Sequence, residues 1–186
     1  MTISNTWNET AINAWTAGVI DGEGTIQIVG HTRTKKEKFT HGSFQLRILV
    51  SNTRVEMIKM LIEFWGGNIC VPKRNKESSV WATSYRWTVL AKRACNLLER
   101  CLPYFVIKRK QAELAIEFQN RINQRKGYVV LSRRTGIGKS VNLLDEEVVT
   151  RQKLQLEIRK LNQKGKIGEK GWSEYTKRKN GNNNGN

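Results

Sequence analysis

The sequence is poor in the residues that most often carry disulfide, zinc or histidine chemistry. Its 186 residues include three cysteines, two histidines and two prolines. Cys70, Cys95 and Cys101 lie in apolar surroundings without a Cys-x-x-Cys pair, which excludes the usual zinc patterns and predicts reduced thiols in the core. His31 and His41 both fall in a basic segment, so catalysis by a histidine base is not expected.

Long apolar runs are absent as well. No run of about 18 apolar residues occurs, so we expect no membrane-spanning segment. The first nine residues lack the positive start and apolar stretch of a signal peptide. We therefore expect an intracellular protein that is neither secreted nor bound to a membrane.

Acidic residues are also few. Sixteen Asp and Glu residues stand against 33 Lys and Arg residues, which gives a net charge of +17. Such an excess predicts a polyanionic partner, either nucleic acid or an acidic membrane surface. The length suffices for one domain with a substantial core and an appendage.

One stretch, residues 14–24, combines a helix-forming segment with an unusually small face. Ala14, Ala17, Gly18, Asp21 and Gly22 recur at helical spacing, where a core helix would carry Leu, Ile or Phe. Glycine inside a helix costs about 1 kcal/mol relative to alanine. The small face therefore predicts that another backbone approaches this helix closely.

Two acids follow at the end of this helix, in the sequence Asp21-Gly22-Glu23-Gly24. The helix dipole disfavours negative charge at a C-terminus, so we expect a cation nearby, and a divalent metal is the first candidate. The alternative is a polar turn in which Gly24 adopts a left-handed conformation and ends the helix.

The hydrophobic pattern predicts an α+β fold. Helices are expected over residues 11–21, 52–65, 92–102, 107–123 and 143–162, and strands over 25–29, 42–51, 68–73 and 80–89. Paired strands between helices favour an antiparallel sheet with helices on one face. We divide the chain into an arm (1–10), a core (11–125), a connector with a C-terminal helix (126–163) and a basic, Asn/Gly-rich tail (164–186).

The strand over residues 42–51 has two different faces. Its apolar face carries Phe44, Leu46, Ile48 and Val50, and its polar face carries Ser43, Gln45 and Arg47. Side chains of the polar kind read base edges in the major groove, although an ordinary solvated face has the same pattern. Farther along, Lys108, Arg109 and Lys110 crowd the start of a helix, where we expect an anion in the working complex.

Two segments resemble the LAGLIDADG homing endonucleases. Thr16–Gly24 resembles the motif that names the family, with Thr16 in place of the first Leu and Glu23 in place of the second Asp. Pro103–Ala112 resembles the segment that opens a later helix of the family, and the likeness covers roughly residues 10–123. One copy of the motif is present, as in the homodimeric members.

This resemblance implies an αββαββα homing-endonuclease fold with a concave antiparallel sheet, helices on one face and an extra C-terminal helix. It also implies a metal-dependent, staggered double-strand cut with 3′ overhangs in a long, roughly palindromic DNA site. The gene would be intron-encoded, and the protein would work in a chloroplast, a mitochondrion or a prokaryotic cytoplasm. Mg²⁺ is the expected cofactor, Mn²⁺ should substitute for it, and Ca²⁺ should support binding without cleavage.

The resemblance assigns roles to particular residues. Catalysis falls to Glu23, Lys108, Asn52 and Arg54, although Glu56 stands where the family has an arginine. Metal binding falls to Glu23, Gly22 and Asp21, with Asp21 mainly structural. The expected contacts to double-stranded DNA are Gln27, Arg33, Lys35, Lys36, Lys38, Ser43, Gln45, Arg47, Lys73, Arg74, Arg86 and Lys110. The homodimer interface would comprise Ala14, Ala17, Gly18, Asp21 and Gly22.

Two other functions fit the same charge. An RNA maturase would bind its own intron RNA and assist splicing, and a non-catalytic DNA-binding protein would need only the basic sheet face. The acids at positions 21 and 23 favour a nuclease, because nucleic-acid binding alone does not need them.

Overall fold

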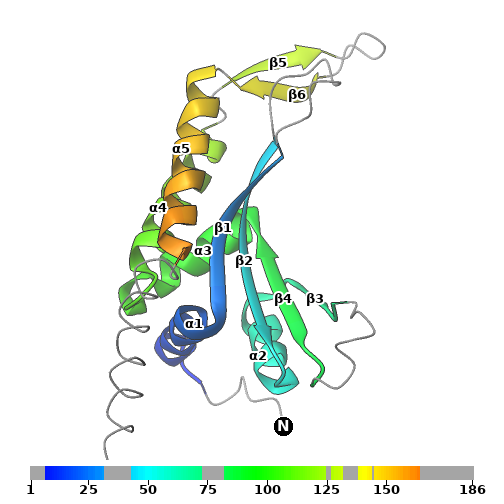
Figure 1. The fold of residues 1–186 in the computed structure, drawn as a ribbon, viewed down its shortest axis with the longest axis vertical. Coiled ribbons are helices and arrows are strands. Elements are labelled where there is room, and N and C mark those ends of the chain that lie inside the picture. Colours follow the sequence, from blue (N-terminus) through cyan, green and yellow to red (C-terminus); the bar gives the residue numbers. More distant parts are fainter. Residues whose placement is uncertain are drawn as a thin grey trace, which may run out of the picture.

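The structure, a computed structural model, describes residues 7–31, 43–72, 82–124, 127–131, 138–143 and 145–163. Figure 1 shows a twisted sheet with helices packed against it. The sheet is antiparallel, in the order β1-β2-β4-β3, and consists of β1 (Gly24–His31), β2 (Ser43–Asn52), β3 (Asn68–Cys70) and β4 (Tyr85–Leu90). The helices are α1 (Glu9–Glu23), α2 (Val55–Trp65), α3 (Ala91–Cys101), α4 (Arg109–Asn123) and α5 (Asp145–Asn162). The α+β class and the order of these elements confirm the prediction.

The sheet is buried on one face, as the alternation along β2 predicted. Ile26, Ile48 and Val89 face one another across β1, β2 and β4, and each is at most 1% exposed. The helices pack their apolar sides onto this face. The opposite face carries Gln27 and Arg47; none of the described helices covers it, and these two side chains are partly exposed.

Helix α1 starts and ends differently from its expected bounds. The Asn8 side chain accepts a hydrogen bond from the Ala11 N–H at 2.8 Å, so Asn8 caps the helix, as its residue type favours. The helix continues to Glu23, and Gly24 follows with φ −88°, in extended backbone. The alternative in which Gly24 forms a left-handed turn is therefore wrong. Gly24 is glycine for another reason, since a Cβ there would lie 2.7 Å from the Ile20 Cα.

Helix α2 begins later than expected. Asn52 and Thr53 were the expected first residues, but Asn52 ends β2, and its Oδ1 accepts from the Arg54 N–H at 2.8 Å. This short turn lets the chain leave the sheet before the helix begins. Gly66 and Gly67 end the helix with φ values of 64° and 96°, which favour glycine.

Two buried tryptophans connect α2 to its neighbours. Trp65 Nε1 donates to the Thr16 hydroxyl at 2.9 Å, and Trp87 Nε1 donates to the Gly66 carbonyl at 2.7 Å. Thr16 is fully buried, so its hydroxyl is needed as an acceptor for an indole that has no water to bond. This contact explains why the motif begins with threonine rather than leucine in this chain.

The C-terminal region contains a hairpin that the sequence did not reveal. Residues 127–141 were expected to be a connector, but they include β5 (Gly127–Leu131) and most of β6 (Gly138–Leu143), which pair antiparallel. Asn142, directly before the expected start of the last helix at residue 143, lies in β6. Glycines at both strand starts and the mixed polarity of Lys139-Ser140-Val141-Asn142 gave no clear alternation to predict strands.

Helix α5 covers the β1 edge of the sheet. It packs along β1 and α4, and two of its side-chain amides bond to β1 (Figure 1). Gln155 donates to the Ile28 carbonyl at 2.9 Å, and Asn162 donates to the Ile26 carbonyl at 2.8 Å. An uncovered edge strand is a template for pairing with other chains, and these contacts remove it.

Candidate nucleic-acid interface and catalytic centre

The Asp21 carboxylate bonds to the segment that enters α4. Oδ2 accepts from the N–H groups of Val106 and Ile107 at 2.8 and 3.1 Å, and Oδ1 accepts from the Lys108 N–H at 2.8 Å. Asp21 is only 7% exposed. A carboxylate of the protein itself thus occupies the start of α4, where the partial positive charge of the helix stabilises it.

The Lys108 side chain bonds in turn to the end of α1. Its side chain is buried, and Nζ donates to the Ile20 carbonyl at 2.7 Å and also to the Asp21 carbonyl. Carbonyl groups in the last turn of a helix carry partial negative charge and attract cations, and the Ile20 carbonyl accepts from the Gly24 N–H as well. Asp21 and Lys108 therefore tie the C-terminus of α1 to the N-terminus of α4, each with the charge that the opposite helix end favours.

Glu23 is the acid that this arrangement leaves exposed. It is the last residue of α1, and Gly22 before it is exposed as well. Within the described parts of the chain, no group of three or more His, Cys, Asp or Glu residues could hold a metal by itself. One protomer therefore offers the Glu23 carboxylate and the nearby Gly22 carbonyl, two hard oxygen donors of the kind that Mg²⁺ prefers.

Asn52 and Arg54 lie at the same end of the sheet as Glu23. Gly24, next to Glu23, pairs with Val50, so the last two residues of β2 extend past the start of β1 and pair with β4 alone. Arg54 is exposed, and Asn52 is partly exposed and bonded to the Arg54 backbone. Three of the residues that the resemblance marked as catalytic thus lie at one end of the sheet, and their catalytic roles stay a prediction. Glu56 is also exposed, in the first turn of α2.

The open face of the sheet holds several of the expected DNA contacts. Gln27 and Arg47 are paired across β1 and β2, Gln45 is opposite Val29, and Arg86 is opposite Ser51. Ser43 is the first residue of β2. Six other expected contacts lie outside the described residues, namely Arg33, Lys35, Lys36, Lys38, Lys73 and Arg74.

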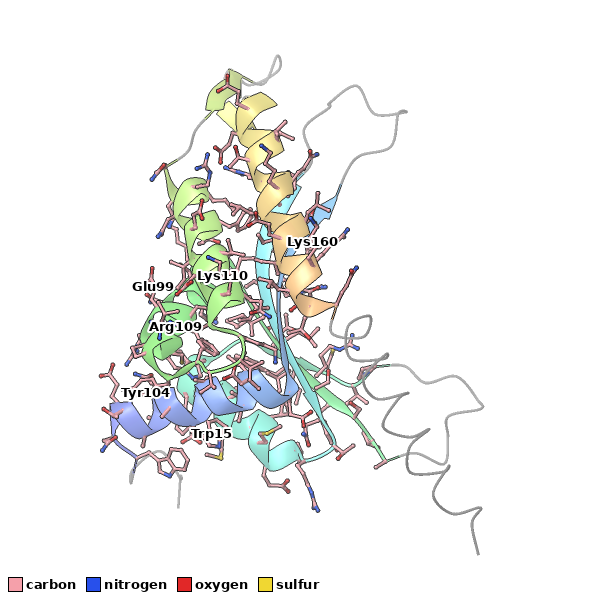
Figure 2. All side chains as sticks on the ribbon, turned by 60° about the vertical axis from the view of Figure 1, so that its left-hand side comes forward. Trp15, Glu99, Tyr104, Arg109, Lys110 and Lys160 are labelled. Atoms are coloured by element: carbon pink, nitrogen blue, oxygen red, sulfur yellow. The ribbon has the colours of Figure 1, made fainter. Side chains whose placement is uncertain are left out.

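Lys110 does not share this face. It lies in the first turn of α4, on the helical side of the sheet, with Nζ 3.9 Å from a Glu113 carboxylate oxygen (Figure 2). Lys110 is exposed, and its contact with DNA stays a prediction. Lys108, two residues earlier, is buried, whereas Lys110 is exposed to solvent.

The residues of the small face of α1 differ in their exposure to solvent. Ala14, Gly18 and Gly22 are exposed, whereas Ala17 is fully buried and Asp21 nearly so. Ala17 and Asp21 pack inside the protomer, so their side chains cannot form part of a dimer interface, and that part of the expectation is wrong. A Cβ at Gly18 or at Gly22 would have nothing within 4 Å. Among the described residues, no contact requires glycine at these two positions.

Two exposed apolar residues beside this face were missed. Val106 is 87% exposed and Ile107 is 57% exposed, and the backbone of both is held by Asp21 at the end of α1. The helix that was expected to begin at residue 107 begins at Arg109, so neither side chain has a helical face that turns it inward. The available signal was the pair of apolar residues directly before a cationic helix start.

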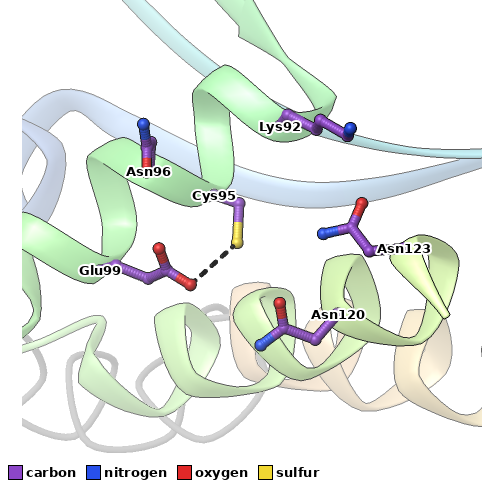
Figure 3. Close-up of a pocket in the computed structure, with 6 residues that line it drawn as sticks. All are labelled: Lys92, Cys95, Asn96, Glu99, Asn120 and Asn123. Carbon is purple, nitrogen blue, oxygen red and sulfur yellow. Dashed lines mark hydrogen bonds between the residues drawn. The ribbon is translucent and has the colours of Figure 1, made fainter.

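A pocket of about 280 Å³ lies apart from this region, between α3 and α4. Figure 3 shows its lining, which consists of Lys92, Cys95, Asn96, Glu99, Asn120 and Asn123. Cys95 Sγ lies 3.5 Å from a Glu99 oxygen. Burial and the charge of Glu99 raise the pKa of Cys95 to about 12, so this thiol stays protonated and is no nucleophile.

The cysteines only partly match their prediction. Cys95 and Cys101 are buried free thiols, whereas Cys70 is exposed on β3. The three residues Asn68–Cys70 are all exposed, because β3 is a short edge strand. Within the described residues, no helix has the length and the apolar character needed to cross a bilayer.

Comparison with known proteins gives matches in structure. No protein-family model matches the chain, and no curated protein does. The archaeal intron-encoded homing endonuclease I-Vdi141I, complexed with DNA, matches with a TM-score of 0.63 and 16% identity, over 85% of this chain and 88% of that chain. The homing endonuclease I-CvuI, in complex with the I-CreI target in the presence of Mg, matches with a TM-score of 0.60 and 20% identity, over 85% and 86%.

A third match is to a longer protein. The LAGLIDADG homing endonuclease I-LtrWI, bound to target DNA, matches with a TM-score of 0.55 and 17% identity, over 81% of this chain and 43% of that chain. The chain has the LAGLIDADG homing-endonuclease fold. In this fold, α1 through α3 supply the αββαββα order that the sequence predicted. Helices α4 and α5 and the β5–β6 hairpin follow it.

Proposed function

We propose that this protein is a site-specific DNA endonuclease that works as a homodimer and makes a metal-dependent, staggered double-strand cut, as an intron-homing enzyme does. The observation that carries the proposal is that the two acids at the end of α1 have different environments. Asp21 and Lys108 fix the helix end, and Glu23 is left exposed where the open polar face of the sheet begins. The structural neighbours I-Vdi141I and I-CvuI are homing endonucleases in complexes with DNA.

The small face of α1 supports the homodimer. Gly18 and Gly22 are exposed glycines inside a helix, and no contact within the protomer requires them. A second copy of α1 packed at close range would require them. Exposed Val106 and Ile107 would add apolar area beside the helix pair.

In such a dimer, two α1 ends meet, and each brings a Glu23 carboxylate and a Gly22 carbonyl. These oxygens would hold Mg²⁺, which when bound lowers the pKa of a water molecule and stabilises charge on the leaving oxygen. Two carboxylates placed close together repel each other, so the paired site favours a divalent cation. Glu is one methylene longer than Asp but supplies the same type of oxygen.

The remaining residues bind and orient. Lys108 places a buried positive charge at the carbonyl end of α1, next to the peptide of Gly22, where negative charge from a phosphate would accumulate. Asn52 and the exposed guanidinium of Arg54 can hold a phosphate oxygen or a water molecule at the same end of the sheet. The polar sheet face then lies along the groove on either side of the cut.

The experiment can start without a known target sequence. A randomised duplex library is selected for binding in Ca²⁺, and the enriched sequences are then incubated with Mg²⁺ and the ends are sequenced. We expect a roughly palindromic site, cut on both strands with 3′ overhangs. Glu23→Gln should bind the same site and cut it at least about 100-fold more slowly. Glu63→Gln, which changes an exposed acid near the other end of α2, is the matched control and should cut normally.

Failure has two clear forms. If no sequence is enriched, the protein is not a site-specific DNA-binding protein. If the enriched site is bound but left intact by the wild type, or cut equally by Glu23→Gln, the catalytic assignment is wrong and the protein is a binding module. Replacing Mg²⁺ by Mn²⁺ in the cleavage step tests whether Mn²⁺ substitutes as expected.

A further inference from the structure

Gln27 and Arg47 lie opposite each other on the open face, one on β1 and the other on β2. The Gln27 amide satisfies its hydrogen-bonding groups when its oxygen faces Arg47. In that orientation the oxygen accepts from Arg47 Nε at 2.9 Å and from Nη2 at 3.0 Å. Both bonds fall on one edge of the guanidinium. No carboxylate among the described residues forms an ion pair with Arg47.

This contact changes what each side chain can offer to DNA. A guanidinium has five N–H donors, and the Gln27 oxygen occupies the edge formed by Nε and Nη2. The edge formed by Nη1 and Nη2 remains, and it matches the two acceptors, O6 and N7, that guanine presents in the major groove. The pair therefore offers donors only.

The same contact prevents Gln27 from recognising adenine in the usual way. Gln recognises adenine by donating to N7 while its oxygen accepts from the N6 amino group. Here the Gln27 oxygen is already used by Arg47. Gln27 is left with N–H donors and cannot accept from adenine or cytosine amino groups.

We propose that Gln27 and Arg47 form one recognition unit that selects guanine at one position in each half of the target site. The inference rests on the proposed function. Gln27 fixes the guanidinium before DNA arrives, which reduces the side-chain entropy lost on binding. Leu90 is the next residue in the same row, on β4, and places no competing polar group beside Arg47.

The position of the unit follows from the strand. Gln27 is four residues from Glu23 along the chain, which corresponds to about 13 Å in extended backbone. The guanine should therefore lie within a few base pairs of the cut. In a two-fold complex the effect must appear at two symmetry-related positions.

The test is a base-preference profile, measured by selection from randomised duplex DNA in Ca²⁺. The wild type, Gln27→Ala, Arg47→Ala and the double variant are compared. Arg47→Ala should lower the preference for guanine at the pair of positions about 5- to 150-fold, and adenine should rise there because the Gln27 oxygen becomes free. Gln27→Ala should weaken the guanine preference at the same positions. The double variant should have no preference there.

Gln45→Ala is the matched control. Gln45 is also a glutamine on the open face of β2, but its partner across the sheet is Val29. Its removal should leave the guanine positions unchanged. Effects of Gln27→Ala and Arg47→Ala at different base pairs, or an Arg47→Ala profile without the rise of adenine, would overturn the recognition unit while leaving the endonuclease proposal intact. A wild type that enriches no site would overturn the proposed function itself.

Discussion

Gly18 allows the homodimer to be tested without damage to the protomer. A Cβ at this position would meet nothing within 4 Å, and the residue is exposed in the middle of α1. Glycine costs about 1 kcal/mol in a helix relative to alanine, and leucine is nearly as favourable as alanine. Gly18→Leu should therefore leave the protomer as stable as the wild type or stabilise it by up to about 1 kcal/mol.

The dimer should respond in the opposite direction. Extra methylene groups in a close-packed contact cost about 1–3 kcal/mol, and a two-fold interface contains each residue twice. The total of about 2–6 kcal/mol raises the dissociation constant by about 30-fold to about 20,000-fold. Sedimentation velocity over a range of concentrations measures this directly. The mass obtained for the wild type should be twice the 21.4 kDa of one chain, and the mass obtained for the variant should be that of one chain.

Gly24 provides the contrasting control. A Cβ there would lie 2.7 Å from the Ile20 Cα and 2.8 Å from its carbonyl oxygen, so Gly24→Ala should destabilise the protomer itself. Thermal unfolding thus separates the two glycines, with Gly24→Ala unfolding earlier and Gly18→Leu unfolding no earlier as a monomer. A Gly18→Leu protein that remains dimeric and cuts DNA would show that the partner does not approach through α1.

Three further predictions concern the protomer. Asp21→Asn should lower the free energy of unfolding by about 1–3 kcal/mol, because three N–H groups lose a charged acceptor, and an unchanged urea midpoint would contradict this. In the native protein near pH 7, a disulfide reagent should react quickly with Cys70 alone, since burial raises the pKa of Cys95 and of Cys101 to about 12, and two or three fast thiols would refute the assignment. Burial raises the pKa of Glu147, but hydrogen bonds and charge from Arg121 and Arg151 outweigh it and leave the pKa below its ordinary value of 4.5. Its contribution to stability is therefore complete above that value and is lost as the pH falls through the lowered pKa. Glu147→Gln should cost about 3–5 kcal/mol at pH 7 and flatten the acid side of the stability profile, and an unchanged profile would exclude this role.

The elements with strong periodicity were predictable from the sequence. The alternation along β2 and the apolar stripe of α2 follow local rules, and the two glycines after Trp65 mark a helix end for a reason of backbone geometry. The small face of α1 and the acids after it also identified the end of α1 as the candidate site. These signals are local, so a single sequence carries them.

Contacts between distant segments were not predictable in the same way. The bonds from Asp21 to residues 106–108 join positions 85 to 87 residues apart, and no spacing rule connects them. The cover of β1 by Gln155 and Asn162 likewise depends on where α5 docks, not on its own pattern. The sequence therefore showed that a charge had to be compensated at each helix end, but not that the two ends compensate each other.

The separate roles of Asp21 and Glu23 follow from the helix itself. Two residues apart on a helix means about 200° of rotation, so the two side chains cannot face the same partner. With Asp21 turned inward to the start of α4, Glu23 must point out of the protomer. Because Lys108 is held by the carbonyls of the same turn, a shift of α1 would move the acid and the cation together. With the spacing Asp-Gly-Glu, the Glu23 carboxylate points outward because the Asp21 carboxylate points inward. The contacts of Asp21 with the start of α4 therefore set the position of the site.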